Sequence, residues 1–222
     1  MLRNRSGILR TLNAHSDPYF RNILYDLGNA GFARIESYLP EELFSELCLE
    51  ASSLKPTAKP VYSESDIKYQ ASLKDLGEKG KAFLNSLWMA DLINTLFTTK
   101  LTPDSKASCY TYYKEGDFLS PHLDHPEQCI VTTILYLDAT SNPSPTGKTG
   151  LELHLYENEM LLSARRPSAT IPTIKGELLV GLGSQTWHER PMLQAGELVT
   201  AITACYSYAT KIKSASALSG VT

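Results

Sequence analysis

The spacing of hydrophobic residues changes from a helical to a strand-like period about halfway along the chain. Before Pro103, apolar residues recur at helical spacing, and the clearest helix begins at Pro40, a residue type that suits the first helical position. The elements predicted for this half are a short helix near 17–27, a strand over 31–37, a helix from Pro40 to Ala51, a surface loop over 54–75 and a helical stretch over 78–97.

After Pro103, short segments rich in β-branched and aromatic residues alternate with turns, which is the pattern of strands. The expected strands are 107–114, 117–123, 129–138, 150–156, 169–174, 177–183 and 197–208. Helices followed by a run of strands predict an α+β fold that is mainly β, with a helical layer packed against a double-sheet jelly roll. We expect a single domain over 1–222, divided into a mainly helical part (1–103), a β core (104–210) and a C-terminal tail (211–222).

Composition and charge narrow the classes of function. The chain is 42% hydrophobic and 20% charged, as in ordinary globular domains, and its net charge of −3 gives no electrostatic reason to bind nucleic acid or a membrane surface. We find no apolar run that would span a bilayer and no secretory signal, so we expect a cytoplasmic protein. Cys48, Cys109, Cys129 and Cys205 form no C-x-x-C pair and lie in apolar contexts, which predicts reduced thiols in the core.

Three side chains in the β region have the chemistry of a metal site. His122 and Asp124 are two residues apart, so on an extended chain both point to the same face. His188 follows an apolar, glycine-containing run much later in the chain. Two histidines and one carboxylate on one side of an ion leave coordination positions open, which suits non-haem Fe(II), although Zn²⁺ or Mn²⁺ would also bind.

The segments around these residues resemble the Fe(II)/2-oxoglutarate dioxygenases of the prolyl-hydroxylase type. The resemblance rests on Tyr113-x-x-Gly-x-x-x-x-Pro-His-x-Asp, on the strand that begins at Val131, on Gly150-Leu-Glu-Leu and on His188-Glu-Arg-Pro. It extends over about residues 30–208 and implies a double-stranded β-helix that binds Fe(II) through His122, Asp124 and His188. It also implies 2-oxoglutarate and dioxygen as cosubstrates, and hydroxylation or desaturation of a C–H bond.

The resemblance fails at one position. The family usually binds the far carboxylate of 2-oxoglutarate with an Arg or Lys about nine to eleven residues after the second histidine, where this chain has Glu197, Leu198 and Val199. Arg190 could supply the missing cation, because it would share a face with His188 on an extended strand; a surface salt bridge is its other interpretation.

Further candidates for this role and for the cosubstrate site lie nearby. Arg165 and Arg166 are alternative cations, while Tyr113, Thr200 and Thr203 are candidates for hydrogen bonds to the cosubstrate.

Three functions follow from these observations. The first is an Fe(II) oxygenase that uses 2-oxoglutarate and acts on a small amino-acid-like or natural-product substrate, with no nucleic-acid or membrane partner and with a homodimer left open. The second is an Fe(II) oxidase of the same fold that does not use 2-oxoglutarate, and the missing basic residue is what favours it. The third is a non-catalytic jelly-roll binding module.

Overall fold

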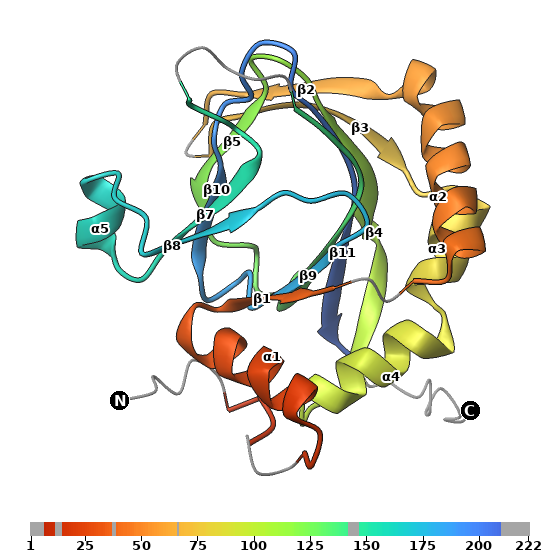
Figure 1. Cartoon of the computed structure of the whole chain (residues 1–222), viewed down its shortest axis with the longest axis vertical. Helices are drawn as coiled ribbons and strands as arrows, with labels where there is room; N and C mark the ends of the chain where they lie inside the picture. Colours follow the sequence, from red (N-terminus) through yellow and green to blue (C-terminus); the bar gives the residue numbers. More distant parts are fainter. Residues whose placement is uncertain (1–6, 12–14, 37–38, 66, 142–146, 210–222) are drawn as a thin grey trace, which may run out of the picture.

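The strands of the protein join into one antiparallel sheet that curls into a nearly closed barrel (Figure 1). The structure is a computed structural model and describes residues 7–11, 15–36, 39–65, 67–141 and 147–209. Its strands are β1 (Phe32–Ile35), β2 (Lys59–Ser63), β3 (Tyr69–Asp75), β4 (Leu101–Tyr113), β5 (Phe118–His122), β6 (Val131–Thr140), β7 (Glu152–Tyr156), β8 (Ala169–Pro172), β9 (Leu178–Gly181), β10 (Trp187–Arg190) and β11 (Leu198–Tyr208). They are ordered β1-β9-β6-β11-β4-β3-β5-β10-β7-β8, with β2 paired to β3.

Helices cover part of the outer face of this sheet. The helices are α1 (Pro18–Asn29), α2 (Glu41–Leu54), α3 (Glu78–Leu84), α4 (Leu87–Leu96) and α5 (Glu159–Ser163), with a 3-10 turn over Lys55–Thr57. α1 to α4 lie against the barrel, whereas α5 projects away from it on the opposite side (Figure 1). Apolar side chains of the first four helices form one buried cluster with the outward-facing residues of the sheet. A helical layer on a mainly β fold is therefore confirmed.

A second hydrophobic cluster fills the barrel. It includes Tyr113, Tyr136, Leu155 and Ala201, all buried. Side chains alternate along a strand, so on β6 Tyr136 points into the barrel while Leu135 belongs to the cluster beneath the helices. This alternation gives the sheet two apolar faces and explains why β6 has no regular polar position in the sequence.

Most predicted elements are present. The seven strands expected after Pro103 are confirmed as β4 to β9 and β11, where the structure adds the short strand β10, and the strand expected over 31–37 is confirmed as β1. The helical stretch over 78–97 is confirmed but divides into α3 and α4 at Asn85 and Ser86, where the Ser86 side chain accepts a hydrogen bond from Met89 N at 3.2 Å and so caps α4. The predicted C-terminal tail lies outside the described residues.

The prediction of a surface loop over 54–75 is wrong, because this segment forms the hairpin β2–β3. Pro60 lies in β2, which is an outer strand of the sheet, where a missing N–H is tolerated. β3 alternates apolar residues with polar ones and pairs with both β4 and β5. The prolines of the segment hid this alternation, and the hairpin places Tyr69 and Leu73 in the wall of the barrel cavity.

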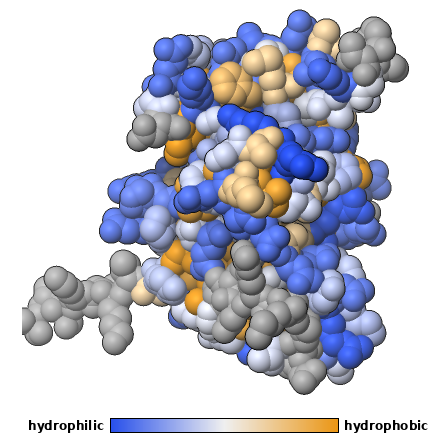
Figure 2. Space-filling model, turned by 90° about the vertical axis from the view of Figure 1, so that its left-hand side faces the viewer, coloured by the Kyte–Doolittle hydropathy of each residue, from blue (hydrophilic) through white to orange (hydrophobic). Residues whose placement is uncertain are grey.

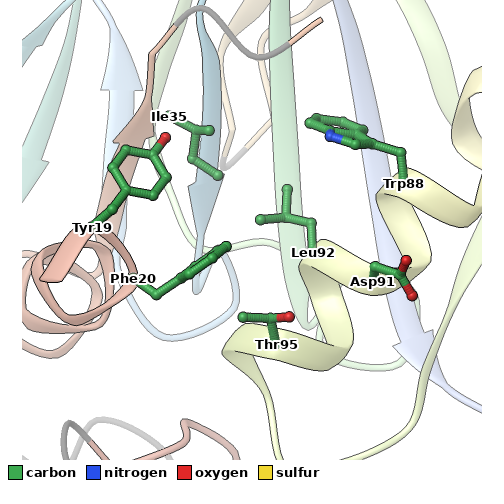
Figure 3. A pocket seen from close by; sticks show the side chains of 7 residues that line it. All are labelled: Tyr19, Phe20, Ile35, Trp88, Asp91, Leu92 and Thr95. Atoms are coloured by element: carbon green, nitrogen blue, oxygen red, sulfur yellow. The ribbon is translucent and has the colours of Figure 1, made fainter. Parts of the chain in front are cut away.

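The face of the molecule from which α5 projects is largely polar (Figure 2). On this face, hydrophobic side chains form small separate patches among hydrophilic ones (Figure 2). None of the described helices combines the length and the apolar character needed to cross a bilayer. A hollow of about 150 Å³ lies between α1 and α4, where Phe20 points toward Leu92 and Tyr19 toward Ile35 (Figure 3).

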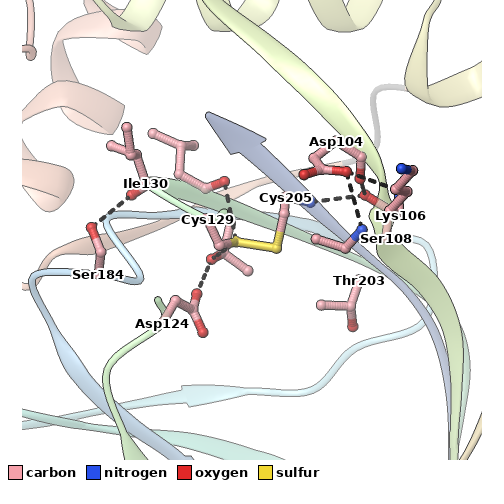
Figure 4. The surroundings of a disulfide bond; sticks show 12 residues. Asp104, Lys106, Ser108, Asp124, Cys129, Ile130, Ser184, Thr203 and Cys205 are labelled. Atoms are coloured by element: carbon pink, nitrogen blue, oxygen red, sulfur yellow. Dashed lines mark hydrogen bonds between the residues drawn. A yellow bond between two sulfur atoms is a disulfide. The ribbon is translucent and has the colours of Figure 1, made fainter. Parts of the chain in front are cut away.

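The prediction that all four cysteines are reduced is also wrong. Cys129 and Cys205 form a disulfide that closes a 76-residue separation (Figure 4). The two cysteines meet because β6 and β11 are neighbours, with Thr132 opposite Cys205 in the register. Isolated cysteines carry no sign of such a pairing in the sequence. Cys48 and Cys109 are free thiols, as expected.

Reduction of the Cys129–Cys205 disulfide is expected to lower the free energy of unfolding by about 4 kcal/mol, because a cross-link over so long a loop restricts the unfolded chain. Urea unfolding with and without a thiol reductant measures the difference. A Cys129→Ser/Cys205→Ser double variant serves as the control, since its unfolding midpoint should be the same with and without the reductant. Equal midpoints for the oxidised and reduced wild type would contradict the prediction.

Candidate metal centre

His122, Asp124 and His188 meet inside one end of the barrel. β5 and β10 pair directly, with His122 opposite His188 in the register, and Asp124 follows β5 by two residues. The carboxylate oxygen Oδ1 of Asp124 lies 3.3 Å from Nε2 of His122 and 3.7 Å from Nε2 of His188. Donor atoms held about 2.1 Å from one ion lie roughly 3 to 3.7 Å from each other, so this spacing fits a single metal ion.

Both imidazoles are oriented by the backbone. Nδ1 of His122 lies 3.0 Å from the carbonyl oxygen of Ser120, and Nδ1 of His188 lies 2.8 Å from that of Thr186. A carbonyl oxygen can only accept, so each Nδ1 carries the proton and donates it. The lone pair is then on Nε2, the atom that faces Asp124, which is the usual arrangement of metal-binding histidines.

The ionisation of the three groups also suits metal binding. Burial, followed by the neighbouring charge of His122, lowers the pKa of His188 to about 4. Burial raises the pKa of Asp124, but the two adjacent imidazoles, His122 before His188, and the hydrogen bond from Thr132 outweigh it and bring the pKa to about 2. Near neutral pH the site therefore offers a neutral His188 and an anionic carboxylate, the forms that bind metal ions. Within the described residues, no other group of histidine, cysteine and acidic side chains has this geometry.

The three side chains line a cavity of about 140 Å³ inside the barrel. Its walls also contain Tyr69, Leu73, Cys109, Thr111, Tyr113, Leu119, Thr132, Ile134, Leu153, Arg190, Ala201 and Thr203. The cavity thus combines one polar cluster at the metal-binding side chains with apolar walls and a single guanidinium, a composition typical of small-molecule sites.

Arg190 is the only arginine or lysine that lines this cavity, among the residues that the structure describes. Arg190 is 4% exposed, and its hydrogen-bond partners are neutral groups. Nη1 donates to Thr173 Oγ1 at 2.9 Å and Nη2 to the Tyr136 hydroxyl at 2.8 Å, while the Tyr113 and Tyr136 rings each lie 5.4 Å from Cζ. None of the ion pairs found in the described part of the chain involves Arg190. The surface salt-bridge interpretation of Arg190 is therefore wrong.

Tyr113 lies in the cavity as the sequence predicted, but Thr200 does not. Tyr113 is buried beside Arg190, and burial raises the pKa of its hydroxyl to about 12. Thr200 lines a separate hollow between α2 and the sheet, with Lys55 and Asp138. Side chains of β11 alternate, so Ala201 and Thr203 face the metal-binding residues and Thr200 faces the helices. Thr203 replaces Thr200 as the hydroxyl on this wall.

The other candidate cations lie away from the cavity. The Arg165 side chain is 64% exposed and pairs with Glu189 at 3.0 Å. Arg166 follows it in the exposed loop after α5. Glu197, at a position where the resemblance expects a base, is buried and accepts hydrogen bonds from Thr149 Oγ1 and Gly150 N, so it stabilises a loop.

Several residues of the site escaped the sequence analysis. Tyr136 and Thr173 hold Arg190 from β6 and from the segment after β8, and Thr132 holds Asp124 from β6. Phe32 of β1 packs on His188 with ring centroids 5.1 Å apart. Nothing in the sequence marks these residues, because each depends on which strands become neighbours. For Tyr69 alone the sequence held a signal, because the alternation of apolar and polar residues over 69–75 is typical of a strand.

Comparisons with known proteins place the fold. A search against protein-family models gives no match, and a search of curated proteins gives none either. Solved structures do match: a prolyl-4-hydroxylase from Pseudomonas putida is 18% identical, with a TM-score of 0.58, over 86% of this chain and 99% of that one. A protein of the 2OG-Fe(II) oxygenase family from Burkholderia pseudomallei is 14% identical, with a TM-score of 0.64, over 87% and 92% of the two chains.

A third structure contains ligands. HygX from Streptomyces hygroscopicus, with nickel, 2-oxoglutarate and hygromycin B bound, is 11% identical, with a TM-score of 0.63, over 86% of this chain and 88% of that one. Identities this low carry no residue roles, but three structures that each align with most of the chain agree on the architecture. The protein therefore has the fold of prolyl-4-hydroxylase and other 2OG-Fe(II) oxygenases.

Proposed function

We propose that this protein is a non-haem Fe(II) oxygenase that uses 2-oxoglutarate and oxidises a C–H bond of a small molecule. The observation that carries the proposal is one cavity that holds both three converging metal donors and a buried guanidinium without a carboxylate partner. When bound, Fe(II) supplies the ability to activate dioxygen, coupled to the conversion of 2-oxoglutarate to succinate and CO₂.

The metal would be held by Nε2 of His122, Nε2 of His188 and Oδ1 of Asp124. Their fit rests on the chemistry of the donors: two ring nitrogens and one carboxylate oxygen lie within 4.8 Å of one another. Three donors on one side leave room for the cosubstrate and dioxygen on the other. These three ligands alone would also bind Zn²⁺ or Mn²⁺. The argument for Fe(II) therefore depends on whether the cavity also has a binding site for 2-oxoglutarate.

Arg190 would bind the far carboxylate of 2-oxoglutarate. A buried guanidinium surrounded by neutral groups is costly unless an anion neutralises it. Nε of Arg190 and one of the Nη2 protons have no hydrogen-bond partner among the described residues, which leaves donors for a carboxylate. Tyr113 keeps its proton near neutral pH, since burial raises its pKa to about 12, and can donate to the same anion.

Apolar residues of the cavity would keep water from the reacting groups. Leu119, Ile134 and Leu153 line the space between the metal donors and the surrounding sheet. A dry site strengthens the electrostatic interaction between Arg190 and a carboxylate, because the local dielectric constant is low. The same walls limit side reactions of the bound cosubstrate with water.

The proposed architecture is a double-stranded β-helix within a single domain. Both parts of the chain build the site, because Phe32 packs on His188 and Tyr69 and Leu73 line the cavity, although all three belong to the first 103 residues. The mainly helical part is therefore not a separate unit. The likeness to the solved oxygenase structures, which covers both parts, supports the same architecture.

The position of Arg190 favours 2-oxoglutarate over the alternative of an oxidase that needs none. That alternative rested on the absence of an Arg or Lys nine to eleven residues after His188. Arg190 supplies a cation in the cavity from a different position. We propose an amino-acid-like or natural-product substrate, because a cavity of about 140 Å³ admits only a small reacting group. The structural neighbours named prolyl-4-hydroxylase and HygX, the latter with bound hygromycin B, fit this range.

Anaerobic titration of the protein with Fe(II) and then 2-oxoglutarate tests the proposal. The expected result is a weak visible charge-transfer band that appears only when both are present. The control is Fe(II) with succinate, which lacks the 2-oxo group and should give no band. Failure to bind Fe(II) would support the non-catalytic module. Retained iron without a band, together with oxygen consumption that does not need 2-oxoglutarate, would support the oxidase.

A further inference from the structure

The hydroxyl of Thr132 lies between the disulfide and the carboxylate of Asp124. Thr132 Oγ1 is hydrogen-bonded to Oδ2 of Asp124, and it lies 3.2 Å from Sγ of Cys129. Figure 4 shows Asp124 directly beside the disulfide. Thr132 is 3% exposed, and it lies on β6 opposite Cys205 of β11. This contact joins a covalently fixed part of the sheet to one of the three metal donors.

The direction of this hydrogen bond follows from the chemistry of the two neighbours. The sulfur of Cys129 carries no proton because it is part of the disulfide. The Oδ2 atom of Asp124 faces the Thr132 hydroxyl, and a carboxylate oxygen accepts hydrogen bonds. The only proton in the group therefore belongs to the Thr132 hydroxyl, and the carboxylate is the stronger acceptor. Thr132 donates to Oδ2.

The backbone of Gly183 completes the clamp around Asp124. Its carbonyl oxygen accepts from Asp124 N at 3.0 Å. A Cβ at position 183 would collide with Asp124 Oδ2 and Thr132 Oγ1, so only glycine leaves room for their hydrogen bond. With the main chain and Oδ2 both held, Oδ1 is the oxygen that faces the two imidazoles.

We propose that Thr132 is a positioning residue that holds Oδ2 of Asp124 and so presents Oδ1 to the metal. The inference rests on the proposed function, because it assumes that Asp124 is a metal donor. Thr132 would not touch metal or cosubstrate through its hydroxyl; it acts through Asp124. Groups that hydrogen-bond to a metal-binding side chain typically contribute about 10- to 100-fold to metal affinity.

Metal binding by Thr132→Val tests the inference without turnover. Valine keeps the branched shape and removes only the hydroxyl, so the fold should persist. Calorimetric titration of Thr132→Val with Co²⁺ should give a dissociation constant about 10- to 100-fold above that of the wild type. Thr132→Ser restores the hydroxyl and should return the constant to within about threefold of the wild-type value. Thr133→Val is the matched control: Thr133 is the next residue of β6, is also buried and is absent from the cavity walls, so its variant should bind Co²⁺ normally.

The outcomes separate this inference from the proposed function. If the wild type binds no Co²⁺, both the proposed function and the positioning role of Thr132 are overturned. If the wild type binds Co²⁺ and Thr132→Val binds it equally well, only the positioning role is overturned. Equal losses in Thr132→Val and Thr132→Ser would also overturn it, because a variant that keeps the hydroxyl would then bind Co²⁺ no better than one that lacks it. Gly183→Ala provides a second route to the same measurement and should weaken Co²⁺ binding while Thr132 itself is unchanged.

Discussion

Replacing Asp124 with alanine is expected to abolish turnover and to remove Fe(II) from the protein. Asp124 supplies the only anionic donor of the cluster, and its Oδ1 lies within 3.7 Å of both ring nitrogens. Its loss should weaken metal binding by more than about 100-fold, the upper end of what losing a group behind a metal donor causes. His122→Ala should behave in the same way. Iron content after gel filtration, and succinate released per protein, measure the two effects.

The control for these variants is His125→Ala. His125 lies one residue after Asp124, is exposed and takes no part in the metal-binding cluster. Its replacement should leave iron content and turnover unchanged. Thermal unfolding of the metal-free proteins should give similar midpoints for all variants, because the removed side chains line a cavity rather than the packed core. Full activity in Asp124→Ala or His122→Ala would refute the assignment of the metal donors.

The sequence contained enough to predict that the three proposed metal ligands meet, because part of their arrangement depends on short-range geometry. His122 and Asp124 are kept together by their spacing, and Arg190 shares a strand face with His188 by the same alternation. The structure brings all four to one cavity. Thr200 shows the limit of this reasoning. The sequence offered both Thr200 and Thr203 as hydroxyls on this strand, but a bulge next to Ala201 and the alternation of β11 put Thr203, not Thr200, in the cavity.

The parts of the site that the sequence did not reveal all depend on strand order. β3 lies between β4 and β5, although it precedes both in the chain, and so brings Tyr69 into the cavity. β6 and β11 are neighbours, which brings together the two cysteines of the Cys129–Cys205 disulfide. Such pairings join residues distant in sequence, and local hydrophobic patterns carry no information about them. The polar residues that support the site are therefore less predictable than the donors themselves.

The fold explains why the positive charge of the cavity comes from Arg190 and not from the positions nine to eleven residues after His188. On β10, Arg190 is two residues past His188 and reaches the interior from the same strand, where Tyr136 and Thr173 hold its guanidinium. Glu197 is fixed in a loop by hydrogen bonds from Thr149 and Gly150, and Val199 is packed in the apolar cluster of the barrel. The positions after the second histidine are thus occupied by structural residues, and the positive charge comes from another strand of the same cavity.

Replacing Arg190 with methionine is expected to raise the apparent Michaelis constant for 2-oxoglutarate by about 10- to 100-fold. A hydrogen bond to a charged group contributes about 1.5 to 3 kcal/mol, which corresponds to this change in affinity. Arg190→Lys keeps the charge but loses the planar pair of donors, so its effect should be intermediate. Arg165→Met is the matched control, because Arg165 is exposed and pairs with Glu189 outside the cavity; its Michaelis constant should match that of the wild type.

A cosubstrate analogue distinguishes loss of the carboxylate contact from general damage. 2-Oxopentanoate has the same carbon chain as 2-oxoglutarate but lacks the far carboxylate. The wild type should bind it about 10- to 100-fold more weakly than 2-oxoglutarate, whereas Arg190→Met should bind the two almost equally, because the group that discriminates between them is gone. Anaerobic titration of the Fe(II) protein, followed by the charge-transfer band, measures both affinities. A variant that still prefers 2-oxoglutarate by the wild-type ratio would show that another cation binds the carboxylate, and Arg190 would then only stabilise the tyrosines around it.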